Sequence, residues 1–555
     1  MANDKNELVF CPLGGVGEIG MNFGLYGYGP RDKREWIVVD CGVTFPGPDL
    51  PGVDLVLPDT QFIEREVKRL RGIIITHAHE DHYGALLDLW PRLKAEVWMT
   101  PFTAGLLEAK REGEHNAPDV PVRIFKPGET FDVGPFSIEA IHVTHSIPEP
   151  VSLAITTPVG TVIHTGDWKI DPAPSLGQRI DEARFRELGE AGVLALVCDS
   201  TNAMREGESP SEEAVGKGLR EVIEEAAGRV AVTTFSSNVG RIRSIAEAAR
   251  DAGRQVLVLG RSLKRVIDVA TDLGYLEGLP PFLPEEDFGY LPRENAVILC
   301  TGSQGESRAA LAKLARDEMR NVALTAGDTV VYSSRVIPGN EKAILETKNL
   351  LIEQGIKIIE DTDALVHVSG HPRRNELRQM YEWVKPKVLV PVHGEAAHLV
   401  AHGALGAQAG IPEVAQIRNG DVLRLAPGAA EIIDQAPVGR IFRDGKIIGD
   451  DEQVGVRDRR KLSFAGHVAV NVVLDDKLNL DGDPDLVAIG VPEKDDSGAY
   501  IEDLMTESAI SAVRSIPRQK RRDLDLVAEA VRRAVRGASA QSWGKKPIVT
   551  VFVTQ

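Results

Sequence analysis

Cysteine is scarce in this chain, and the spacing of the few cysteines excludes a disulfide framework. Only four occur among 555 residues, and none stands near another: Cys11, Cys41, Cys198 and Cys300. Zinc fingers and dithiol redox motifs need cysteines a few residues apart, so both classes are excluded. We expect four reduced, buried thiols that behave as small apolar side chains.

Long apolar runs and a targeting segment are also missing. The sequence has no stretch of about twenty apolar residues, which argues against a membrane-spanning helix. Its first residues, Met1 to Glu7, lack the basic and apolar blocks of a signal peptide. The sequence therefore predicts a cytoplasmic protein that does not use a membrane.

Positive charge is in deficit, because the formal net charge is -18. Such a charge favours solubility and, taken alone, disfavours a polyanionic partner. Affinity for nucleic acid, however, depends on the lysines and arginines of the local groove, and bound divalent cations reverse the local sign. Nucleic-acid binding is therefore not excluded.

The composition that remains is that of an ordinary globular protein. With 43% hydrophobic and 26% charged residues, the chain is long enough for about three or four domains. Short β-type runs and turns fill the sequence to about residue 201. After Ser200, strands and helices alternate as in βα units on a parallel sheet. A histidine-bearing stretch returns at 367–398, and a small α/β unit ends the chain.

The hexapeptide His-Ala-His-Glu-Asp-His at 77–82 is the strongest chemical signal, and it directly follows an apolar run. In so short a turn, His77 and His79 can point to one side while Asp81 and His82 point to another. Neutral imidazoles with a carboxylate, and without thiolate, are the ligands of an open, catalytic zinc site. The pattern therefore predicts two adjacent divalent cations, although a polar turn of hydrogen-bonded histidines would look similar.

Three further ligand-type residues follow apolar runs elsewhere in the chain. His145, Asp167 and His393 each stand beside a turn residue at the end of a strand-like segment. Taken singly, each is more often a structural polar group than a ligand. With the hexapeptide they supply seven ligands, enough for two metal ions that share one carboxylate.

A glycine-rich segment at 15–20 fits the dinucleotide-binding fingerprint, with Asp40 about twenty residues further on. The segment that follows, 21–28, is a glycine-broken strand pattern rather than a helix. The fingerprint therefore lacks the helix that a pyrophosphate needs, and we do not expect a nucleotide there.

These residues carry a family resemblance. The seven ligand-type residues resemble the ligand motifs of the metallo-β-lactamase fold, and segments 198–202 and 368–371 resemble the added motifs of its β-CASP nuclease branch. The similarity to the ribonuclease J family is closer still and covers nearly the whole chain. Its other motifs lie at 13–20, 235–238, 300–306 and 367–371.

The resemblance implies an α/β fold: a metallo-β-lactamase αββα sandwich, an inserted β-CASP α/β domain and a small C-terminal α/β domain. We expect the first part of the sandwich domain at 1–205 and the β-CASP domain at 206–360. The rest of the sandwich domain is expected at 361–430, a linker at 431–460 and the C-terminal domain at 461–555.

The resemblance also assigns roles to the candidate ligands. His77, His79 and His145 would hold one zinc ion (Zn²⁺), Asp81, His82 and His393 a second, and Asp167 would bridge them, with Mn²⁺ or Mg²⁺ as substitutes. Beside these, Asp81, Asp199 and His371 are the candidate catalytic residues. His371 would donate a proton to the leaving oxygen or stabilise the phosphoryl charge, because imidazole titrates near neutral pH. Asp199 would orient a ligand histidine, or else only cap a strand.

The same resemblance predicts where RNA is bound. Hydroxyl side chains and glycine amides suit phosphate oxygens, although each is also ordinary turn chemistry. The candidate substrate-binding residues are Phe235, Ser236, Ser237, Asn238, His367, Val368, Ser369, Gly370 and His371. Where the family usually has a histidine, this chain has Gly240 followed by Arg241, so the pocket is expected to be looser or to rely on the arginine.

A structural calcium ion is a further candidate ligand, with Asp49 and Asp444 as the residues that would hold it. Isolated aspartates on glycine-rich turns are more often simply solvated.

We interpret the sequence as a zinc-dependent ribonuclease acting on single-stranded RNA. The family implies 5′-to-3′ exonuclease action favoured by a 5′ monophosphate, together with endonuclease cleavage, in mRNA decay and rRNA maturation. It also implies a homodimer or homotetramer, assembled with help from the C-terminal domain, and partners in RNA degradation.

Three alternatives stay open at this point. A hydrolase of small molecules with the same fold would leave the inserted domain and His371 without a role. A DNA-processing β-CASP nuclease is disfavoured by His393. A non-catalytic RNA-binding scaffold would not need the intact ligand set.

Overall fold

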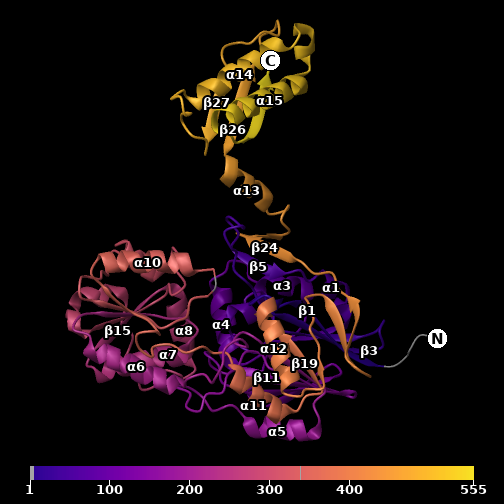
Figure 1. The fold of residues 1–555 in the computed structure, drawn as a ribbon, viewed down its shortest axis with the longest axis vertical. Coiled ribbons are helices and arrows are strands. Elements are labelled where there is room, and N and C mark those ends of the chain that lie inside the picture. The colour runs from indigo at the N-terminus through magenta and orange to yellow at the C-terminus, as the bar shows by residue number, and fades with distance from the viewer. Residues whose placement is uncertain (1–5, 338) are drawn as a thin grey trace. The chain divides into compact units, whose positions relative to one another are not determined.

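The computed structural model describes residues 6–337 and 339–555, and Figure 1 shows its elements. The chain forms two compact units. The first contains the described residues up to Thr44 together with Leu57–Arg440, and the second contains Phe45–Val56 and Ile441–Gln555. Within the described residues, no helix is both long and apolar enough to cross a membrane.

Two stacked sheets form the centre of the first unit. The first sheet has the order β23 (Glu431–Gln435), β22 (Asp421–Ala426), β1 (Glu7–Gly14), β3 (Phe23–Gly29), β4 (Glu35–Val39), β6 (Leu70–Ile74), β7 (Val97–Met99) and β8 (Val122–Ile124). The second has the order β21 (Glu413–Val414), β19 (Val388–Val392), β13 (Ala195–Asp199), β12 (Gly160–His164), β11 (Val151–Thr157), β10 (Phe136–His142) and β9 (Thr130–Val133).

Alternation along the strands divides the apolar side chains between two cores. In β13, Ala195 and Val197 pack with the first sheet, whereas Leu196 and Cys198 pack with helices on the other side. This follows from the two-residue period of a strand, which sends neighbouring side chains to opposite faces. A central strand with two covered faces is apolar throughout, which is why β13 reads as one continuous hydrophobic run.

Helices cover the outer faces of both sheets. The second sheet is covered by α5 (Glu182–Ala191), α11 (Arg374–Val384) and α12 (Ala396–Gln408), whose apolar residues share one core with it. On the side of the first sheet lie α1 (Gln61–Arg65), α3 (Leu86–Leu93) and α4 (Pro101–Glu112). The expected αββα sandwich is therefore confirmed.

A second α/β domain is inserted between two neighbouring strands of the sandwich. Strands β13 and β19 pair in parallel, yet Asp199 ends the first and Val388 begins the second. Most of the intervening chain forms a parallel sheet in the order β15 (Gln255–Leu259), β16 (Ala296–Cys300), β14 (Val230–Thr233), β17 (Thr329–Tyr332) and β18 (Lys357–Ile359). Its helices are α6 (Glu212–Glu225), α7 (Val239–Asp251), α8 (Arg261–Asp272), α9 (Ala310–Ala315) and α10 (Glu341–Glu353).

A buried charge network joins the inserted domain to the sandwich. The guanidinium of Arg241 is fully buried, and its Nη2 lies 2.8 Å from Glu212 Oε2. Its Nη1 donates to Ser333 Oγ at 2.6 Å and to the carbonyl oxygen of Val366 at 3.1 Å. From the sandwich, Lys169 Nζ lies 3.7 Å from the other oxygen of Glu212. Arg241 therefore holds the domains together and is not free to bind a phosphate, which corrects the expectation that the pocket relies on it.

Two small sheets remain, and the second of them lies wholly within the second unit. One has the order β25 (Ile447–Gly449), β24 (Arg440–Asp444) and β5 (Leu55–Pro58), and α13 (Val456–Ala465) follows it in the chain. The other has the order β27 (Asp485–Ile489), β26 (His467–Val473) and β28 (Ile548–Thr554). Helices α14 (Ile501–Ser515) and α15 (Leu524–Trp543) share an apolar core with this last sheet, as expected for a C-terminal α/β domain.

Some elements differ from the sequence-based expectation. The stretch predicted as a linker, 431–460, contains β23, β24, β25 and the start of α13. The glycine-rich fingerprint is followed by strand β3 and not by a helix, as its sequence predicts.

We expect Arg241→Met to lower the stability of the first unit by about 3 kcal/mol, because Glu212 would stay buried without its main cation. The measurement is the shift of the unfolding transition in urea. The matched control is Arg250→Met on the same helix, since Arg250 pairs with Asp251 at the surface and should change the transition little. Equal shifts for the two variants would contradict the role given to the buried network.

Candidate metal centre

The hexapeptide forms a tight turn and one helical turn directly after strand β6. His77 and His79 precede the short helix α2 (Glu80–Tyr83), which contains Asp81 and His82. Backbone N–H groups fix this helix against the segment after β4, because Cys41 donates to the carbonyl of His82 at 2.6 Å and Val43 to that of Glu80 at 3.0 Å. The change from turn to helix sends the two pairs of side chains in different directions.

Gly42 makes this close approach possible. A β-carbon at position 42 would overlap the carbonyl oxygen of Asp81. Glycine is the one residue whose missing side chain lets two backbone segments approach so closely.

The remaining candidate ligands arrive from one edge of the second sheet. Asp167 follows β12, and His393 follows the parallel strand β19. His145 follows β10 on the same sheet. Parallel strands bring their carboxyl ends to a common edge, so residues far apart in sequence meet there.

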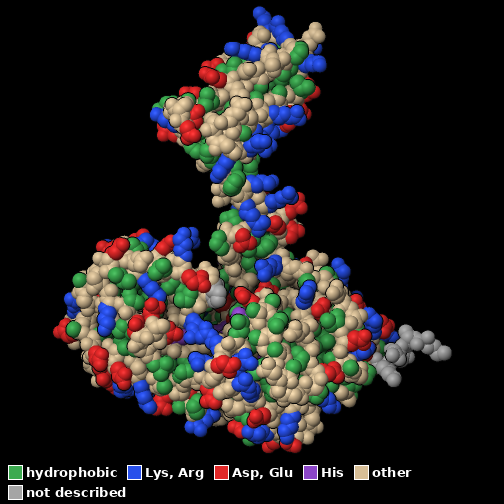
Figure 2. Space-filling view, in the orientation of Figure 1, with side chains coloured by type: hydrophobic (Ala, Val, Ile, Leu, Met, Phe, Trp, Pro, Cys, Tyr) green, Lys and Arg blue, Asp and Glu red, His purple; other side chains and the backbone are tan. Residues whose placement is uncertain are grey.

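Asp167 lies where two groups of side chains meet. Ligand atoms of His77, His79, His145 and Asp167 all lie within 4.8 Å of one another, and so do those of Asp81, His82, Asp167 and His393. Asp167 Oδ2 is 3.3 Å from His82 Nε2 and 3.7 Å from His145 Nε2, while Asp167 Oδ1 is 3.6 Å from His393 Nε2. The structure thus brings together all seven candidate ligands, in the two groups that the sequence resemblance assigns. Figure 2 shows histidine side chains in a hollow of the first unit.

The donor set fits divalent cations. Asp167 Oδ1 is buried and has no hydrogen-bond partner, although buried carboxylate oxygens are normally satisfied. His79 Nδ1 faces two other imidazole nitrogens, His77 Nε2 at 3.1 Å and His145 Nε2 at 3.0 Å. Three imidazole nitrogens that converge in this way can coordinate one shared cation. Imidazole together with carboxylate is a ligand set that suits zinc.

Local electrostatics favour the metal-binding forms of His79 and Asp167, whereas Asp167 and Asp81 outweigh burial and raise the pKa of His82 well above its ordinary value. Burial lowers the pKa of His79 to about 4, against the opposite effect of Asp81 and Asp167, so its imidazole is neutral. Burial opposes ionisation of Asp167, but His393 and His82 outweigh it and hold the pKa of this carboxyl well below its ordinary value. Neutral imidazole and ionised carboxylate are the forms that coordinate a cation.

A second layer of groups orients the candidate ligands. His82 Nδ1 donates to Asp40 Oδ2 at 2.7 Å, and His393 Nδ1 donates to Asn22 Oδ1 at 2.9 Å. His145 Nδ1 donates to the carbonyl oxygen of Gly370 at 2.7 Å. Such bonds fix the ring orientation and leave Nε2 to face the metal.

Sequence reasoning missed the roles of Asp40 and Asn22. Asp40 follows strand β4 and was considered only as a possible ribose ligand. Its second oxygen accepts from the backbone N–H of Thr76 at 2.8 Å, so one carboxylate joins two strand ends below the hexapeptide. A carboxylate at the end of a buried strand was the available signal, but the sequence does not say which histidine it meets.

His371 lies beside the two groups and is held by Asp199. Its Nδ1 donates to Asp199 Oδ2 at 2.7 Å, and its ring centroid is 5.1 Å from that of His145. Burial alone would lower the pKa of His371, but Asp199 and Asp167 outweigh it and raise that pKa to about 9. The expectation that Asp199 orients a ligand histidine is therefore corrected, because its partner is His371 and Asp40 is the acceptor for a ligand.

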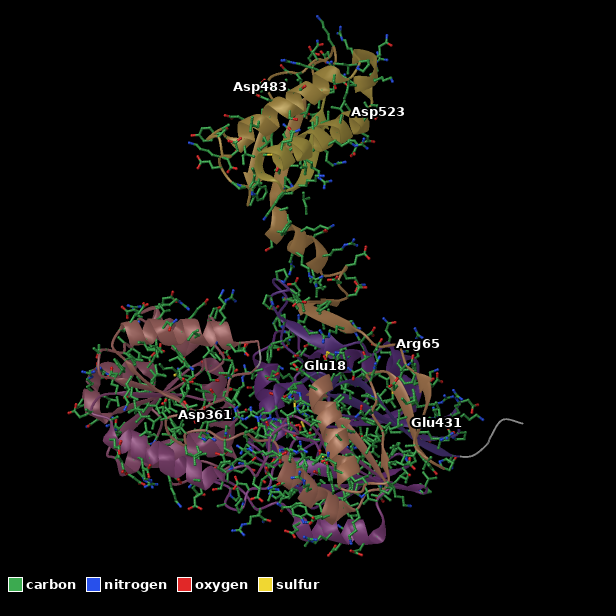
Figure 3. All side chains as sticks on the ribbon, in the orientation of Figure 1. Glu18, Arg65, Asp361, Glu431, Asp483 and Asp523 are labelled. Atoms are coloured by element: carbon green, nitrogen blue, oxygen red, sulfur yellow. The ribbon has the colours of Figure 1, made fainter. Side chains whose placement is uncertain are left out.

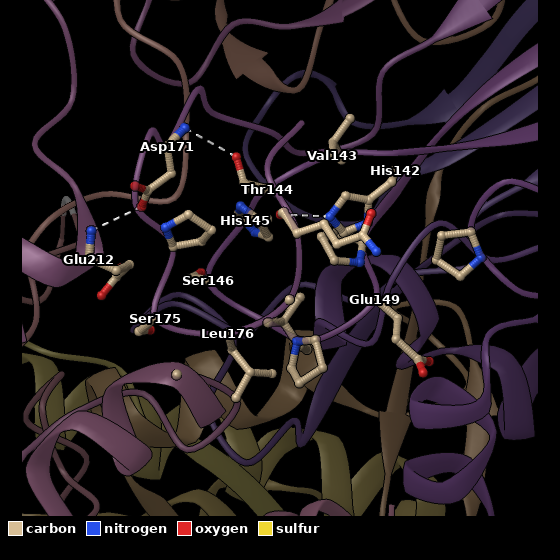
Figure 4. A pocket seen from close by; sticks show the side chains of 18 of the residues that line it. His142, Val143, Thr144, His145, Ser146, Glu149, Asp171, Ser175, Leu176 and Glu212 are labelled. Atoms are coloured by element: carbon tan, nitrogen blue, oxygen red, sulfur yellow. Dashed lines mark hydrogen bonds between the residues drawn. The ribbon is translucent and has the colours of Figure 1, made fainter. Parts of the chain in front are cut away.

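A cavity of about 380 Å³ lies next to the centre, on the side of His145. Figure 4 shows its walls, which come from the sandwich at His142–Pro150 and from the inserted domain at Glu212. Asn238 and Gly240 line it, and a β-carbon at Gly240 would lie 2.5 Å from Ser175 Oγ. The space beside Gly240 is therefore occupied by the hydroxyl of Ser175, and the residue itself has no side chain to offer a ligand.

The other predicted substrate-binding residues are placed in two segments. Phe235, Ser236 and Ser237 form the half-exposed turn before α7, and Asn238 caps that helix by accepting from the N–H of Arg241 at 2.9 Å. Ser369 accepts from Asn202 Nδ2 at 2.9 Å, close to His371. His367 and Val368 are largely enclosed. Burial, followed by the charge of Arg241, lowers the pKa of His367 well below its ordinary value.

The calcium prediction gains no support from the described residues. Asp444 is paired with Arg459, and the backbone carbonyl of Asp49 accepts from Arg460. Neither aspartate belongs to a group of three ligand-type side chains.

Comparison with known families agrees with this geometry. Residues 35–188 match the β-lactamase superfamily domain, and residues 227–351 match the ribonuclease J β-CASP domain. Residues 355–415 match the Zn-dependent metallo-hydrolase RNA specificity domain, and residues 454–555 match the ribonuclease J C-terminal domain.

Proteins that are similar to this chain over nearly its whole length are described as ribonuclease J. Ribonuclease J of Sinorhizobium meliloti is 66% identical over 100% of this chain and 98% of its own length. Ribonuclease J of Mycolicibacterium smegmatis is 37% identical over 98% of this chain and 96% of its own length. A solved structure of a protein of unknown function from Enterococcus faecalis V583 has a TM-score of 0.52 at 16% identity, covering 75% of this chain and 100% of that one, which shows a shared fold alone.

We expect Asp40→Asn to weaken metal binding about 10- to 100-fold, because the ring of His82 would lose its charged acceptor. Competition with a chelator, followed by elemental analysis, measures the change. Asp119→Asn is the matched control, since the side chain of Asp119 is 96% exposed and lies outside the centre. Unchanged metal affinity in the Asp40 variant would remove Asp40 from the support of the centre.

Proposed function

This chain belongs to the ribonuclease J family and is a ribonuclease, and on that premise we propose that it uses two zinc ions to cleave single-stranded RNA. The proposal includes 5′-to-3′ exonuclease action favoured by a 5′ monophosphate, and internal cleavage. The observation that carries it is the meeting of seven candidate ligands around Asp167, with His371 directly beside them.

The residues would share the metal ions as follows. His77, His79 and His145 suit one ion, Asp81, His82 and His393 suit the other, and the two oxygens of Asp167 suit a bridge. Bound divalent cations in such a pair lower the pKa of water and neutralise charge on a phosphodiester. The unsatisfied Oδ1 of Asp167 supports this reading.

His371 is suited to proton transfer at the leaving oxygen. Its Nδ1 is occupied by Asp199, so Nε2 is the ring nitrogen available to a substrate. A protonated imidazole held by a carboxylate can donate from Nε2 to the oxygen that leaves the phosphorus, and Asp199 keeps the ring in that orientation. His371 also lies within ligand distance of Asp167 and His393, so its role must be separated from metal binding by experiment.

The cavity beside His145 is a suitable recess for the end of an RNA strand. Asn238 supplies an amide group to its wall, and Ser146 and Ser175 supply hydroxyl groups. Its carboxylates are engaged, since Asp171 Oδ2 accepts from the N–H of Glu212 at 2.9 Å and Glu149 Oε1 accepts from Tyr275 at 2.6 Å. Phosphate recognition there would rest on neutral donors, among them the hydroxyl of Ser175 that lies beside Gly240.

The cellular setting is part of the proposal. The family supports a cytoplasmic enzyme of mRNA decay and rRNA maturation, working as a homodimer or homotetramer with other RNA-degrading proteins. Zn²⁺ is the proposed resident metal, with Mn²⁺ or Mg²⁺ as substitutes.

The purified protein with Zn²⁺ or Mn²⁺ should degrade 5′-monophosphorylated single-stranded RNA faster than RNA with a 5′ hydroxyl or triphosphate, and should leave DNA of the same sequence intact. His79→Ala should abolish this activity and lower the metal content, because His79 contacts two other ligands of one group. The measurements are a time course on end-labelled substrates and elemental analysis.

The control is His115→Ala, an exposed histidine outside both groups of ligands. It should behave like the parent protein. A fully active His79→Ala enzyme would contradict the metal assignment, and equal rates on RNA and DNA would contradict the substrate.

His371→Ala should keep the metal content of the parent protein and lower turnover about 10²- to 10⁴-fold, the usual contribution of a positioned acid. Single-turnover rates under saturating RNA measure the loss, and added imidazole should restore part of it. Loss of metal in this variant would instead make His371 a ligand.

A further inference from the structure

Basic side chains are concentrated in one part of the second unit, although the chain as a whole is acidic. Between Arg514 and Arg536 there are eight lysines and arginines and only three acidic residues, in a chain of net charge -18. Figure 2 shows several of the blue side chains on the upper and right-hand parts of this unit. The net charge of this segment is opposite in sign to that of the whole chain, and this difference needs a physical reason.

These residues lie on three consecutive segments of the chain, which are joined closely to one another. Arg521 joins the end of α14 to the 3-10 helix η4 (Arg518–Arg522), because it donates to the carbonyl oxygens of Ile516 at 2.9 Å and of Arg514 at 3.2 Å. Helix α15 begins directly afterwards, where Asp523 caps it by accepting from the N–H of Leu526. Figure 3 labels Asp523, which marks this end of the helix.

The outward face of α15 carries further basic residues. Val527, Val531 and Val535 are fully buried against the domain core. Arg533 and Arg536 are exposed and lie on the opposite side of the helix, because positions three and four apart share a face. We call Arg514, Lys520, Arg522, Arg533 and Arg536 the basic terminal surface.

Most of this positive charge is not neutralised within the chain. Arg514, Lys520, Arg522 and Arg536 are exposed and have no ion pair with another described residue. Arg533 shares the single carboxylate of Glu529 with Arg532. Like charges held close together repel and destabilise a small domain, so the arrangement indicates an anionic partner.

We propose that the basic terminal surface binds the phosphate backbone of RNA, as a second contact separate from the catalytic centre. This inference rests on the proposed function, because it takes RNA as the substrate. Arginine predominates on the surface, and its planar guanidinium binds phosphate oxygens in a forked geometry. Contacts of this kind carry no base preference, as a general degradative enzyme requires.

The chemistry of the surface favours RNA over a protein partner. The outward positions of α15 at 525, 529, 532, 533 and 536 are all charged. A protein interface needs an apolar or aromatic centre from which charge is depleted. These positions provide none, and the neighbouring Leu526, 40% exposed, is too small to form such a centre.

A second copy of this chain is also a poorer fit. In two acidic turns of the same unit the carboxylate oxygens are engaged. Asp475 Oδ1 accepts from the N–H groups of Lys477 and Asn479, and Asp495 Oδ1 from those of Ser497 and Ala499. Carboxylates that hold their own turns are weak partners for an arginine surface.

Two RNA contacts on one chain have a kinetic consequence. RNA held at the terminal surface has a raised local concentration at the catalytic centre, provided that it is long enough to reach both. The surface should therefore lower the KM for long RNA without changing kcat. For short oligonucleotides, which reach only the catalytic centre, KM and kcat should not depend on the basic terminal surface.

The test is a fourfold variant, Arg514→Gln, Lys520→Gln, Arg522→Gln and Arg536→Gln, in the full-length chain. KM for an RNA of several hundred nucleotides should rise about tenfold, with kcat unchanged and with both constants unchanged for a pentanucleotide. The slope of log affinity against log salt should become less negative by about 3, since each lost phosphate contact on a single strand contributes about 0.7. Circular dichroism verifies the fold.

The matched control removes the same charge elsewhere. Lys33, Lys68, Lys357 and Lys387 are exposed lysines of the first unit. Their combined replacement by glutamine should leave KM for long RNA and the salt slope close to those of the parent protein.

Filter binding of the same long RNA, measured with His371→Ala as the background, separates this inference from the proposed function. A parent protein that cleaves no RNA would refute the function, yet loss of binding in the fourfold variant would still support the surface. An unchanged KM and salt slope in the fourfold variant would overturn the inference. So would a fall in molecular mass by light scattering with unchanged RNA affinity, because the surface would then belong to an interface between copies.

Discussion

The enclosure of one carboxylate by imidazoles is the constraint on which the rest of the structure depends. Asp167 is buried, ionised and lacks a hydrogen-bond partner for one of its oxygens, a costly state unless positive charge is supplied. Burial lowers the pKa of His77, His79 and His145, whereas neighbouring carboxylates raise the pKa of His82 well above its ordinary value. A divalent cation bound beside Asp167 would relieve the conflict, and in this way the fold favours metal binding.

The order of the strands in the second sheet positions Asp167 and the other candidate ligands that follow this sheet. The parallel strands β12, β13 and β19 end at one edge, where Asp167, Asp199 and His393 follow one another across the sheet. The inserted domain separates β13 from β19 in sequence and returns as the segment that carries Gly370 and His371. Because the Gly370 carbonyl orients His145 while Asp199 holds His371, the geometry of the centre is set where the two domains join. The buried pair of Arg241 and Glu212 fixes that junction, which explains why an arginine next to the expected phosphate pocket is not available to phosphate.

The sign of the charge differs between the parts of this protein. The chain as a whole is acidic, cations held by the candidate ligands would reverse the sign of the charge at the metal centre, and the segment from Arg514 to Arg536 provides positive charge outside it. Whole-chain charge was therefore a poor guide to the substrate, as the opposed signs of the acidic chain and the segment from Arg514 to Arg536 make plain. The close approach of Ser175 to Gly240 shows the same limit on a smaller scale, since no pattern in the sequence connects the two positions.

The sequence by itself indicated an alternation of strands and helices and, through dense local motifs such as residues 77–82, the candidate ligands. The sandwich fold and the inserted domain were implied by the family resemblance that these motifs carry. The sequence could not determine the partners of Asp40, Asn22 and Asp199, since these lie 42, 371 and 172 residues away along the chain. Nor could it show that 431–460 contains regular strands. Glycine and charge there resemble a linker, and only pairing with neighbouring strands identifies β23, β24 and β25. Only the tertiary structure decided which carboxylate supports a ligand and which supports His371, because hydrogen bonds between distant strand ends depend on how the sheet is assembled and not on local composition.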